Sequence, residues 1–458
     1  MKNYLVVLQV LFYVIFISCS SHHLYPDPLP SSDTIAAKPK EHFPADTFIT
    51  SLSCQNNPNE FYAIYLPPNY NDTIKLPVII FFDPHGGGEF VVSKYKTLGK
   101  SFNVVLMGSN SSRNGINPEQ TDAIALHMVA EVIHRFAVDP QQIIFAGFSG
   151  GAKVAMDNAA HNPSVSALIY GGAFSDQPPQ RIPLLGFAGT GDMNYSDLIS
   201  FDQSLKGSNH FLKEWNGNHE WPDSPVFKDA FYWIKFNAMR SHATTINKSL
   251  ADQFISEHAE TINGENDLLK IASGYKEMIY FLSGVEDISI YAKQFSTVLQ
   301  DPDYVKIISE KKQLLLQEQS IKQQYMNDFN DKDLMWWKKE LEHMNAISDV
   351  KQKPVYQRLL GFISLAANSF SMRAIRNNDA ETAERMLGIY QLADPKNPEV
   401  QILKADFFIM KGDSIGAIGA LKKSVQLGWK DSTRVLSEPL LVPLHKNVKF
   451  MQVVKQMK

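Results

Sequence analysis

The chain has 458 residues, with 44 Lys and Arg against 48 Asp and Glu, so its net charge is −4. That length is enough for two or three domains, and a hydrophobic content of 44% is enough to build sizeable cores. No block of basic residues stands out, which disfavours nucleic acid as a partner.

The N-terminus has one early lysine, Lys2, followed by a mostly apolar run over residues 4–17. The run is too short to span a membrane and is typical of a signal peptide. It ends in Phe-Ile-Ser-Cys-Ser, which resembles a bacterial lipobox with Cys19 as the lipidated residue. We expect a signal peptide over residues 1–18 and attachment to a bacterial membrane, at the outer membrane or cell surface. An ordinary secretory peptide is the alternative.

The chain contains two cysteines, Cys19 and Cys54. If Cys19 carries lipid, Cys54 has no partner within the chain, and a disulfide between them is the alternative. No His and Cys cluster has metal-ligand spacing, so we expect neither a metal nor a cofactor. Residues 19–48 contain five prolines and predict an extended, lipidated tether.

A continuous apolar run over residues 76–82 predicts a buried strand, and His85, Gly86, Gly87 and Gly88 follow soon after it. Glycines let backbone N–H groups approach an oxyanion, since no Cβ stands in the way. Gly86 and Gly87 are therefore candidate oxyanion donors. An ordinary glycine-rich turn is the alternative.

A polar loop over residues 108–115 follows a second predicted strand, residues 103–107, and should reach the same edge of the sheet. Asn110 and Arg113 of this loop, together with His85, are candidate substrate-binding residues. Arg113 suits an anionic or sugar portion of a substrate. A solvated loop of turn-forming residues explains the segment equally well.

The apolar run over residues 141–148 ends in Gly-Phe-Ser-Gly-Gly, and a stretch of small, helix-compatible residues follows. This is the strand–turn–helix context of a nucleophilic serine, with Ser149 at the tip. The turn is tight enough to require Gly147 and Gly151. The N–H of Gly150, at a helix N-terminus, is a candidate oxyanion donor.

Two further residues follow predicted strands in the order that such a serine needs. Asp192 comes soon after the run 182–189, and His219 lies in the loop between a strand over 210–215 and a helix over 225–236. His219 would accept the serine proton, and Asp192 would orient the imidazole and stabilise its charged form.

Simpler roles and rival residues remain open for these positions. Asp192 has the alternative role of a helix cap, and His219 that of a solvated loop residue. Asp176, after a predicted strand over 167–173, is the rival acid, and His161 and His210 are weaker rival bases.

The oxyanion loop, the serine turn, Asp192 and His219 together resemble the alpha/beta-hydrolase superfamily over residues of about 50–240. Within it they are most similar to esterases, dienelactone hydrolases and polyhydroxybutyrate depolymerases. The resemblance implies a mostly parallel sheet and an acyl-enzyme formed on Ser149. It also implies a small-molecule or glycan ester as substrate. No large insertion separates the three residues, which argues against a lid and against long-chain lipase activity. Peptide hydrolysis is the alternative.

Beyond residue 240 the pattern becomes helical, because apolar residues recur three and four positions apart over 268–282 and 333–347. Trp336 and Trp337 are expected in a core or a domain interface. Residues near the C-terminus repeat with a 34-residue period that resembles tetratricopeptide repeats. The repeated pairs are Asp379 and Asp413, Ala383 and Ala417, and Leu387 and Leu421.

The sequence therefore predicts an α/β fold, an alpha/beta-hydrolase domain over 49–240, followed by an all-α half. That half is divided into a helical domain over 241–360 and tetratricopeptide-like repeats over 361–458. The repeats are expected to bind a protein partner, to dock on the hydrolase, to shape its substrate entrance or to mediate assembly. A competing hypothesis is a non-catalytic surface receptor or scaffold, against which the presence of Ser149, Asp192 and His219 argues.

Overall fold

The computed structural model describes residues 41–207 and 209–457, and from Phe43 onward the chain forms one compact unit. The expected signal peptide, Cys19 and most of the expected tether lie outside the described residues. Cys54 is buried, with its Sγ 3.6 Å from Oε2 of Glu131. Within the described part of the chain, no helix combines the length and the apolar character that a membrane span requires.

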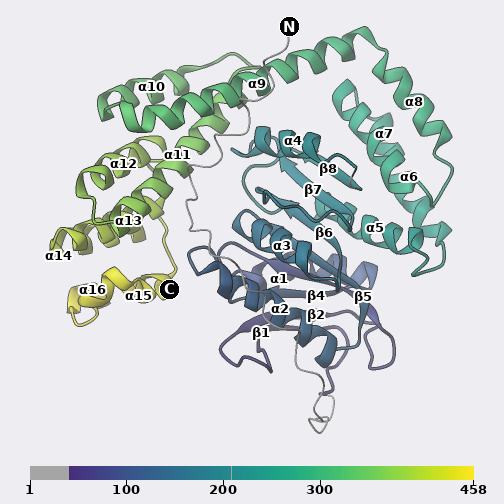
Figure 1. Ribbon diagram of the computed structural model, residues 1–458, viewed down its shortest axis with the longest axis horizontal. Helices are drawn as coiled ribbons and strands as arrows, with labels where there is room; N and C mark the ends of the chain where they lie inside the picture. Colours follow the sequence, from purple (N-terminus) through teal and green to yellow (C-terminus); the bar gives the residue numbers. More distant parts are fainter. Residues whose placement is uncertain (1–40, 208, 458) are drawn as a thin grey trace. The chain divides into compact units, whose positions relative to one another are not determined.

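An eight-stranded sheet is the centre of the N-terminal half (Figure 1). Its strand order is β1-β2-β4-β3-β5-β6-β7-β8, and β2 runs antiparallel to β1 and β4 while the other neighbours are parallel. This is the strand order of the alpha/beta-hydrolase fold, and the mostly parallel sheet that the sequence predicted is confirmed. The strands are β1 (Thr47–Ser53), β2 (Phe61–Leu66), β3 (Leu76–Phe82), β4 (Val105–Ser109), β5 (Val138–Phe148), β6 (Val165–Gly171), β7 (Leu184–Gly189) and β8 (His210–Trp215).

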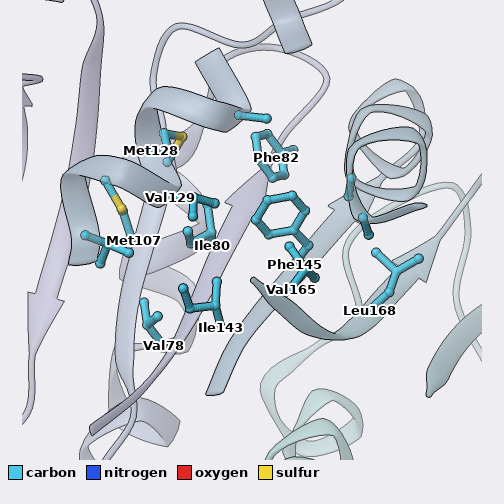
Figure 2. Packing of buried hydrophobic residues seen from close by; sticks show 14 of the residues in the cluster. Val78, Ile80, Phe82, Met107, Met128, Val129, Ile143, Phe145, Val165 and Leu168 are labelled. Atoms are coloured by element: carbon cyan, nitrogen blue, oxygen red, sulfur yellow. The ribbon is translucent and has the colours of Figure 1, made fainter. Parts of the chain in front are cut away.

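Helices cover both faces of the sheet, which explains why its central strands are continuously apolar. Every residue of β3 is buried. Figure 2 shows Ile80 and Phe82 of β3 packing with Phe145 of β5 and with Met128. One face is covered by α2 (Pro118–Arg135), α3 (Gly150–His161) and α4 (Tyr195–Ser204), and the other by α1 (Gly88–Phe102) and α5 (Ser224–Arg240).

The core on the α5 side continues past residue 240. Phe254 of α6 (Lys248–Asn263) and Phe281 of α7 (Leu268–Leu282) are fully buried in the same cluster as residues of the sheet. The ring of Phe254 lies 5.4 Å from that of Phe236 on α5. The domain boundary predicted at residue 240 therefore does not separate two hydrophobic cores.

The helices from α9 (Pro302–Asp331) onward build two further cores, whereas Tyr291 of α8 (Ser289–Leu299) packs against the core on the α5 side. Trp337 is fully buried, and its ring lies 4.8 Å from that of Phe329, in line with the core position expected for the tryptophan pair. The other helices are α10 (Leu334–Ala346), α11 (Lys353–Arg376), α12 (Ala380–Ala393), α13 (Pro398–Met410), α14 (Ser414–Gln426), α15 (Ser432–Ser437), a 3-10 helix (Pro439–Leu444) and α16 (Val448–Val454).

The 34-residue repeat has a structural basis in helix capping. Asp379 accepts a hydrogen bond from the N–H of Thr382 at the start of α12, and Asp413 accepts one from the N–H of Gly416 at the start of α14. A side-chain oxygen at this position satisfies an amide that the helix leaves unpaired. The helices α11 and α12, and likewise α13 and α14, pack as successive pairs. The assignment to tetratricopeptide repeats stays a prediction.

Candidate active site

Ser149 occupies a sharp turn between β5 and α3, with φ of 52° and ψ of −123°. This conformation is strained for a residue other than glycine, and the surrounding contacts must impose it. The N–H of Ser149 donates to the carbonyl of Gly171 at 2.8 Å. A Cβ on Gly147 would lie 2.2 Å from the Gly151 carbonyl oxygen, and one on Gly151 would lie 2.0 Å from that of Phe82. Both positions require glycine, as expected.

Three of the predicted residues form one hydrogen-bonded chain. Nε2 of His219 lies 2.9 Å from Oγ of Ser149. Nδ1 of the same ring lies 2.9 and 3.0 Å from the two carboxylate oxygens of Asp192. Asp192 is 1% exposed, whereas the side chain of His219 is 24% exposed. The arrangement allows a proton to pass from the serine to the imidazole while the carboxylate faces the other ring nitrogen.

The loops that carry the acid and the histidine are tied to each other. The N–H of Gly191 donates to the carbonyl of Gly217 at 2.8 Å, which joins the two loops through their backbones. The N–H of Asn194 donates to Oδ1 of Asp192 at 2.8 Å. The ring of Phe148 lies 4.9 Å from that of His219. The orientation of each side chain therefore depends on both loops.

The rival residues lie elsewhere. Asp176 is exposed on the surface. His161 contacts the carbonyl of Asp157 within its own helix, and Nε2 of His210 lies 3.5 Å from Oδ1 of Asp202. The geometry thus favours the later acid and the later histidine as partners of the serine.

The predicted oxyanion donors, Gly150 on one side and Gly86 and Gly87 on the other, differ in whether their amides already have acceptors. Gly150 is the first residue of α3, where helix amides lack an acceptor one turn earlier and where the helix dipole is positive. The N–H of Gly86 donates to the carbonyl of Asp83 at 3.2 Å, and that of Gly87 donates to Oδ1 of Asp83 at 3.1 Å. Both amides already have acceptors inside their loop, so the structure does not support the prediction that they bind an oxyanion.

Asp83, which the sequence reasoning missed, organises this edge of the sheet. Its carboxylate accepts hydrogen bonds from the N–H of His85 at 2.9 Å and from Nε1 of Trp221 at 2.9 Å, in addition to the hydrogen bond from the Gly87 N–H. Burial alone would raise the pKa of Asp83, but the hydrogen bonds from the His85 and Trp221 side chains outweigh it and lower the pKa. Trp221 follows His219 closely, so Asp83 joins the glycine loop to the histidine loop. Its position directly after β3 was the available sequence clue.

The predicted substrate-binding residues have different surroundings. His85 is 82% exposed in its side chain, and its backbone forms a bridge with that of Arg113, which is also exposed. The prediction for Asn110 is not supported, because its Oδ1 accepts the N–H of Glu89 and its Nδ2 donates to the carbonyl of Thr50, both at 2.9 Å. Both ends of this amide are used to stabilise the fold.

Asn114, four residues further along, was not singled out from the sequence and lies at the site. A Cβ on Gly150 would be 1.8 Å from its Oδ1, so the amide side chain of Asn114 sits directly against the residue that follows the serine. The backbone N–H of Asn114 donates to the carbonyl of Pro84 at 2.8 Å, which fixes it beside the glycine loop.

A buried group of potential metal ligands occurs among the described residues, away from the serine. Asp229, His258 and Glu277 place ligand atoms within 4.8 Å of one another. The ammonium of Lys213 lies 2.5 Å from Asp229 and 2.7 Å from Glu277, so this cluster already contains a cation. We assign no metal to it.

No protein-family model matches the sequence, and a search of curated proteins finds no match. Among solved structures, an esterase from the archaeon Pyrobaculum calidifontis shares 14% identity over 42% of this chain and 85% of its own, with a TM-score of 0.34. Esterase 2 from Thermogutta terrifontis phosphorylated by paraoxon shares 16% over 41% and 91%, with a TM-score of 0.31.

A third similar structure is the Francisella virulence factor BioJ, with 13% identity over 42% of this chain and 86% of its own, at a TM-score of 0.34. These similarities are low. The fold is therefore assigned from the strand order, and the chemistry from the geometry around Ser149.

Proposed function

We propose that this protein is a serine hydrolase that cleaves carboxylic esters through an acyl-enzyme. The observation that carries the proposal is the hydrogen-bonded chain from Ser149 through His219 to Asp192, with the serine at a strained turn before a helix. A serine in a strained backbone conformation costs stability, and such strain is concentrated at functional sites.

The geometry supports a two-step reaction. Nε2 of His219 accepts the proton from Oγ of Ser149 as the oxygen attacks the ester carbonyl, and the imidazolium that forms is stabilised by Asp192. The N–H of Gly150 donates to the developing oxyanion. His219 then gives its proton to the departing alcohol. A water molecule, activated by the same histidine, hydrolyses the acyl-enzyme and releases the acid and Ser149.

The proposed substrates are small acyl esters and esters linked to carbohydrate. The exposed surroundings of His85 and Arg113 suit a polar, wet substrate better than a long acyl chain. Export and a lipid on Cys19 are part of the same proposal, because they would hold the enzyme at a bacterial membrane where acylated glycans are accessible. Mass analysis of the mature N-terminus tests this part. Acylated Cys19 is expected, and a different first residue contradicts it.

The substrate class is tested with a matched panel at near-neutral pH. We expect turnover of p-nitrophenyl acetate and of acetylated oligosaccharides, weak turnover of long-chain p-nitrophenyl esters, and none after Ser149→Ala. Faster turnover of aminoacyl p-nitroanilides than of the esters would replace the esterase by a peptidase. No turnover of any compound by folded protein would favour the scaffold hypothesis, in which the helical half binds a partner.

A further inference from the structure

The loop that carries Asp192 is bonded to two helices of the C-terminal half. Nη1 of Arg358, on α11, donates to the carbonyl of Thr190 at 2.8 Å. Nζ of Lys322, on α9, donates to the carbonyl of Met193 at 2.5 Å. These two carbonyls flank the acid, one on each side along the chain. The backbone around Asp192 is therefore fixed from outside the sheet that carries it.

The donors belong to a buried network with balanced charge. Glu318 of α9 has a fully buried side chain, and those of Arg358 and Lys322 are only 6% and 7% exposed. Arg358 contacts the Glu318 carboxylate through Nε at 3.0 Å and through Nη2 at 2.5 Å. Nζ of Lys322 lies 2.8 Å from Oδ2 of Asp197, at the start of α4. Two cations thus face two carboxylates, and Nζ of Lys322 also lies 3.5 Å from Oε1 of Glu318, so removing one partner leaves the buried charges unbalanced.

Side-chain and backbone packing support the same contact. Oγ of Ser196 donates to Oε1 of Glu318 at 3.0 Å. The guanidinium of Arg358 lies 4.9 Å from the centre of the Tyr195 ring. A Cβ on Gly361 of α11 would lie 3.2 Å from Cβ of Met193, so the helix approaches the acid loop closely. The helix α9 also packs against α4, which follows the loop (Figure 1).

A cavity of about 600 Å³ borders these contacts and is lined by both catalytic loops and by α9 and α11. Gly191 and Asn218, the neighbours of the acid and the histidine, form part of its wall together with Val355 and Arg358. The helices therefore contact the acid loop beside a cavity, through the hydrogen bonds to Thr190 and Met193 and through the close approach of Gly361.

We propose that Arg358, Lys322 and Glu318 are positioning residues for Asp192. The helices α9 and α11 are then required for full catalytic activity and do more than bind a partner. This inference rests on the proposed function, because it presupposes that Asp192 supports the histidine in catalysis. None of the three side chains contacts Ser149 or His219 in the bonds described above. Their effect on the reaction passes through the backbone of the acid loop.

The test compares two buried arginines in the full-length protein. Arg358→Gln removes the donor to Thr190. Arg135→Gln is the matched control, because Arg135 is also buried, pairs with the buried Glu131 at 2.8 Å and donates to the carbonyl of Ser53, far along the chain from the acid loop. Labelling by a fluorophosphonate and the kcat and KM for p-nitrophenyl acetate are measured well below the Tm of each variant.

We expect Arg358→Gln to slow labelling and lower kcat by about tenfold to a hundredfold with little change in KM, since displacing a catalytic group by about 1 Å has effects of this size. Arg358→Lys should recover part of the rate, because its ammonium still donates to one carbonyl. Arg135→Gln should lower the Tm and leave both rates near those of the wild type.

Equal rates for Arg358→Gln and wild type, or an equal loss in Arg135→Gln, would overturn the inference. If Arg358→Gln does not fold, Lys322→Gln takes its place, because it removes the donor to the carbonyl of Met193. Wild-type rates in Lys322→Gln would then reject the inference. If the wild-type protein does not react with the fluorophosphonate, the proposed function itself is rejected. This outcome is distinct from a failure of the inference about Arg358.

Discussion

Replacing Asp192 by Asn tests how the carboxylate serves the histidine. In the native site both carboxylate oxygens lie at hydrogen-bonding distance from Nδ1 of His219, at 2.9 and 3.0 Å, and Oδ1 also accepts the N–H of Asn194. An amide places its oxygen where Asn194 donates, so its NH₂ group takes the other position and faces Nδ1. The imidazole then loses its anionic partner and meets a donor where it had an acceptor.

The expected fall in kcat for Asp192→Asn can be estimated from the effect of the same substitution in other triads. Replacing the acid of such a triad by Asn lowers kcat by about 10⁴-fold, because the imidazole is held in the wrong tautomer. In Asp192→Asn the amide NH₂ group faces Nδ1 in the same way, so we expect a fall of about 10³- to 10⁴-fold, or about 4–5.5 kcal/mol in the barrier. The substitution keeps the shape of the buried side chain, and the Tm should change little.

The assay measures the rate of fluorophosphonate labelling and the kcat for p-nitrophenyl acetate, with Asp176→Asn as the control. Asp176 is the exposed rival acid, and its variant should react like the wild type. A rate for Asp192→Asn within tenfold of the wild type would show that His219 does not depend on the Asp192 carboxylate. A large loss in the control would argue against Asp192 as the acid.

Three further predictions concern stability. Gly151→Ala should destabilise the protein by about 1–3 kcal/mol in urea unfolding, because the new Cβ meets the Phe82 carbonyl at 2.0 Å; unchanged stability contradicts the tight turn. Asn110→Ala should lower the free energy of unfolding by about 1 kcal/mol, because it removes the acceptor for the Glu89 N–H, and KM should stay constant. A raised KM would indicate that Asn110 binds substrate. Burial, followed by nearby carboxylates, raises the pKa of Asp406 from 3.8 to about 8, so wild-type Tm should fall as pH rises between these values. Asp406→Asn should remove that fall, and an equal pH dependence in both proteins argues against it.

Much of the sheet and of the site was predictable because parallel strands bury both faces. The resulting apolar runs are bounded by glycines and polar loops, and the strand over 210–215 and the helix over 268–282 were predicted with the bounds that the structure has. Ser149, Asp192 and His219 follow strand ends in chain order, which is where the chemistry needs them.

The site predictions failed, or missed a residue, where one residue type can serve several different roles. Asn110 and Asn114 lie in the same polar loop, and only the three-dimensional structure shows that the first secures a helix while the second lies against Gly150. Glu318 and Arg358 occur on amphipathic helices, where charged residues usually face solvent. Their contacts with the acid loop join residues more than 100 positions apart in the chain, and no local pattern encodes such a pairing.

The same reasoning applies to the boundary between the two halves. A change from strand-like to helical periodicity occurs near residue 240, and it led to separate domains in the prediction. Periodicity reports local structure and not which core an element joins. Phe254 and Phe281 complete the core on one face of the sheet, so α6 and α7 pack as part of that half.

The proposed function requires Ser149 to be an activated nucleophile, and labelling by a fluorophosphonate reports on this property. The purified protein is reacted with the probe, and the modified peptide is identified by mass spectrometry. We expect one adduct, on Ser149, that is absent in Ser149→Ala and forms at least about a hundredfold more slowly in His219→Ala. A folded wild-type protein that does not react, or an adduct that persists in Ser149→Ala, would contradict the proposed function.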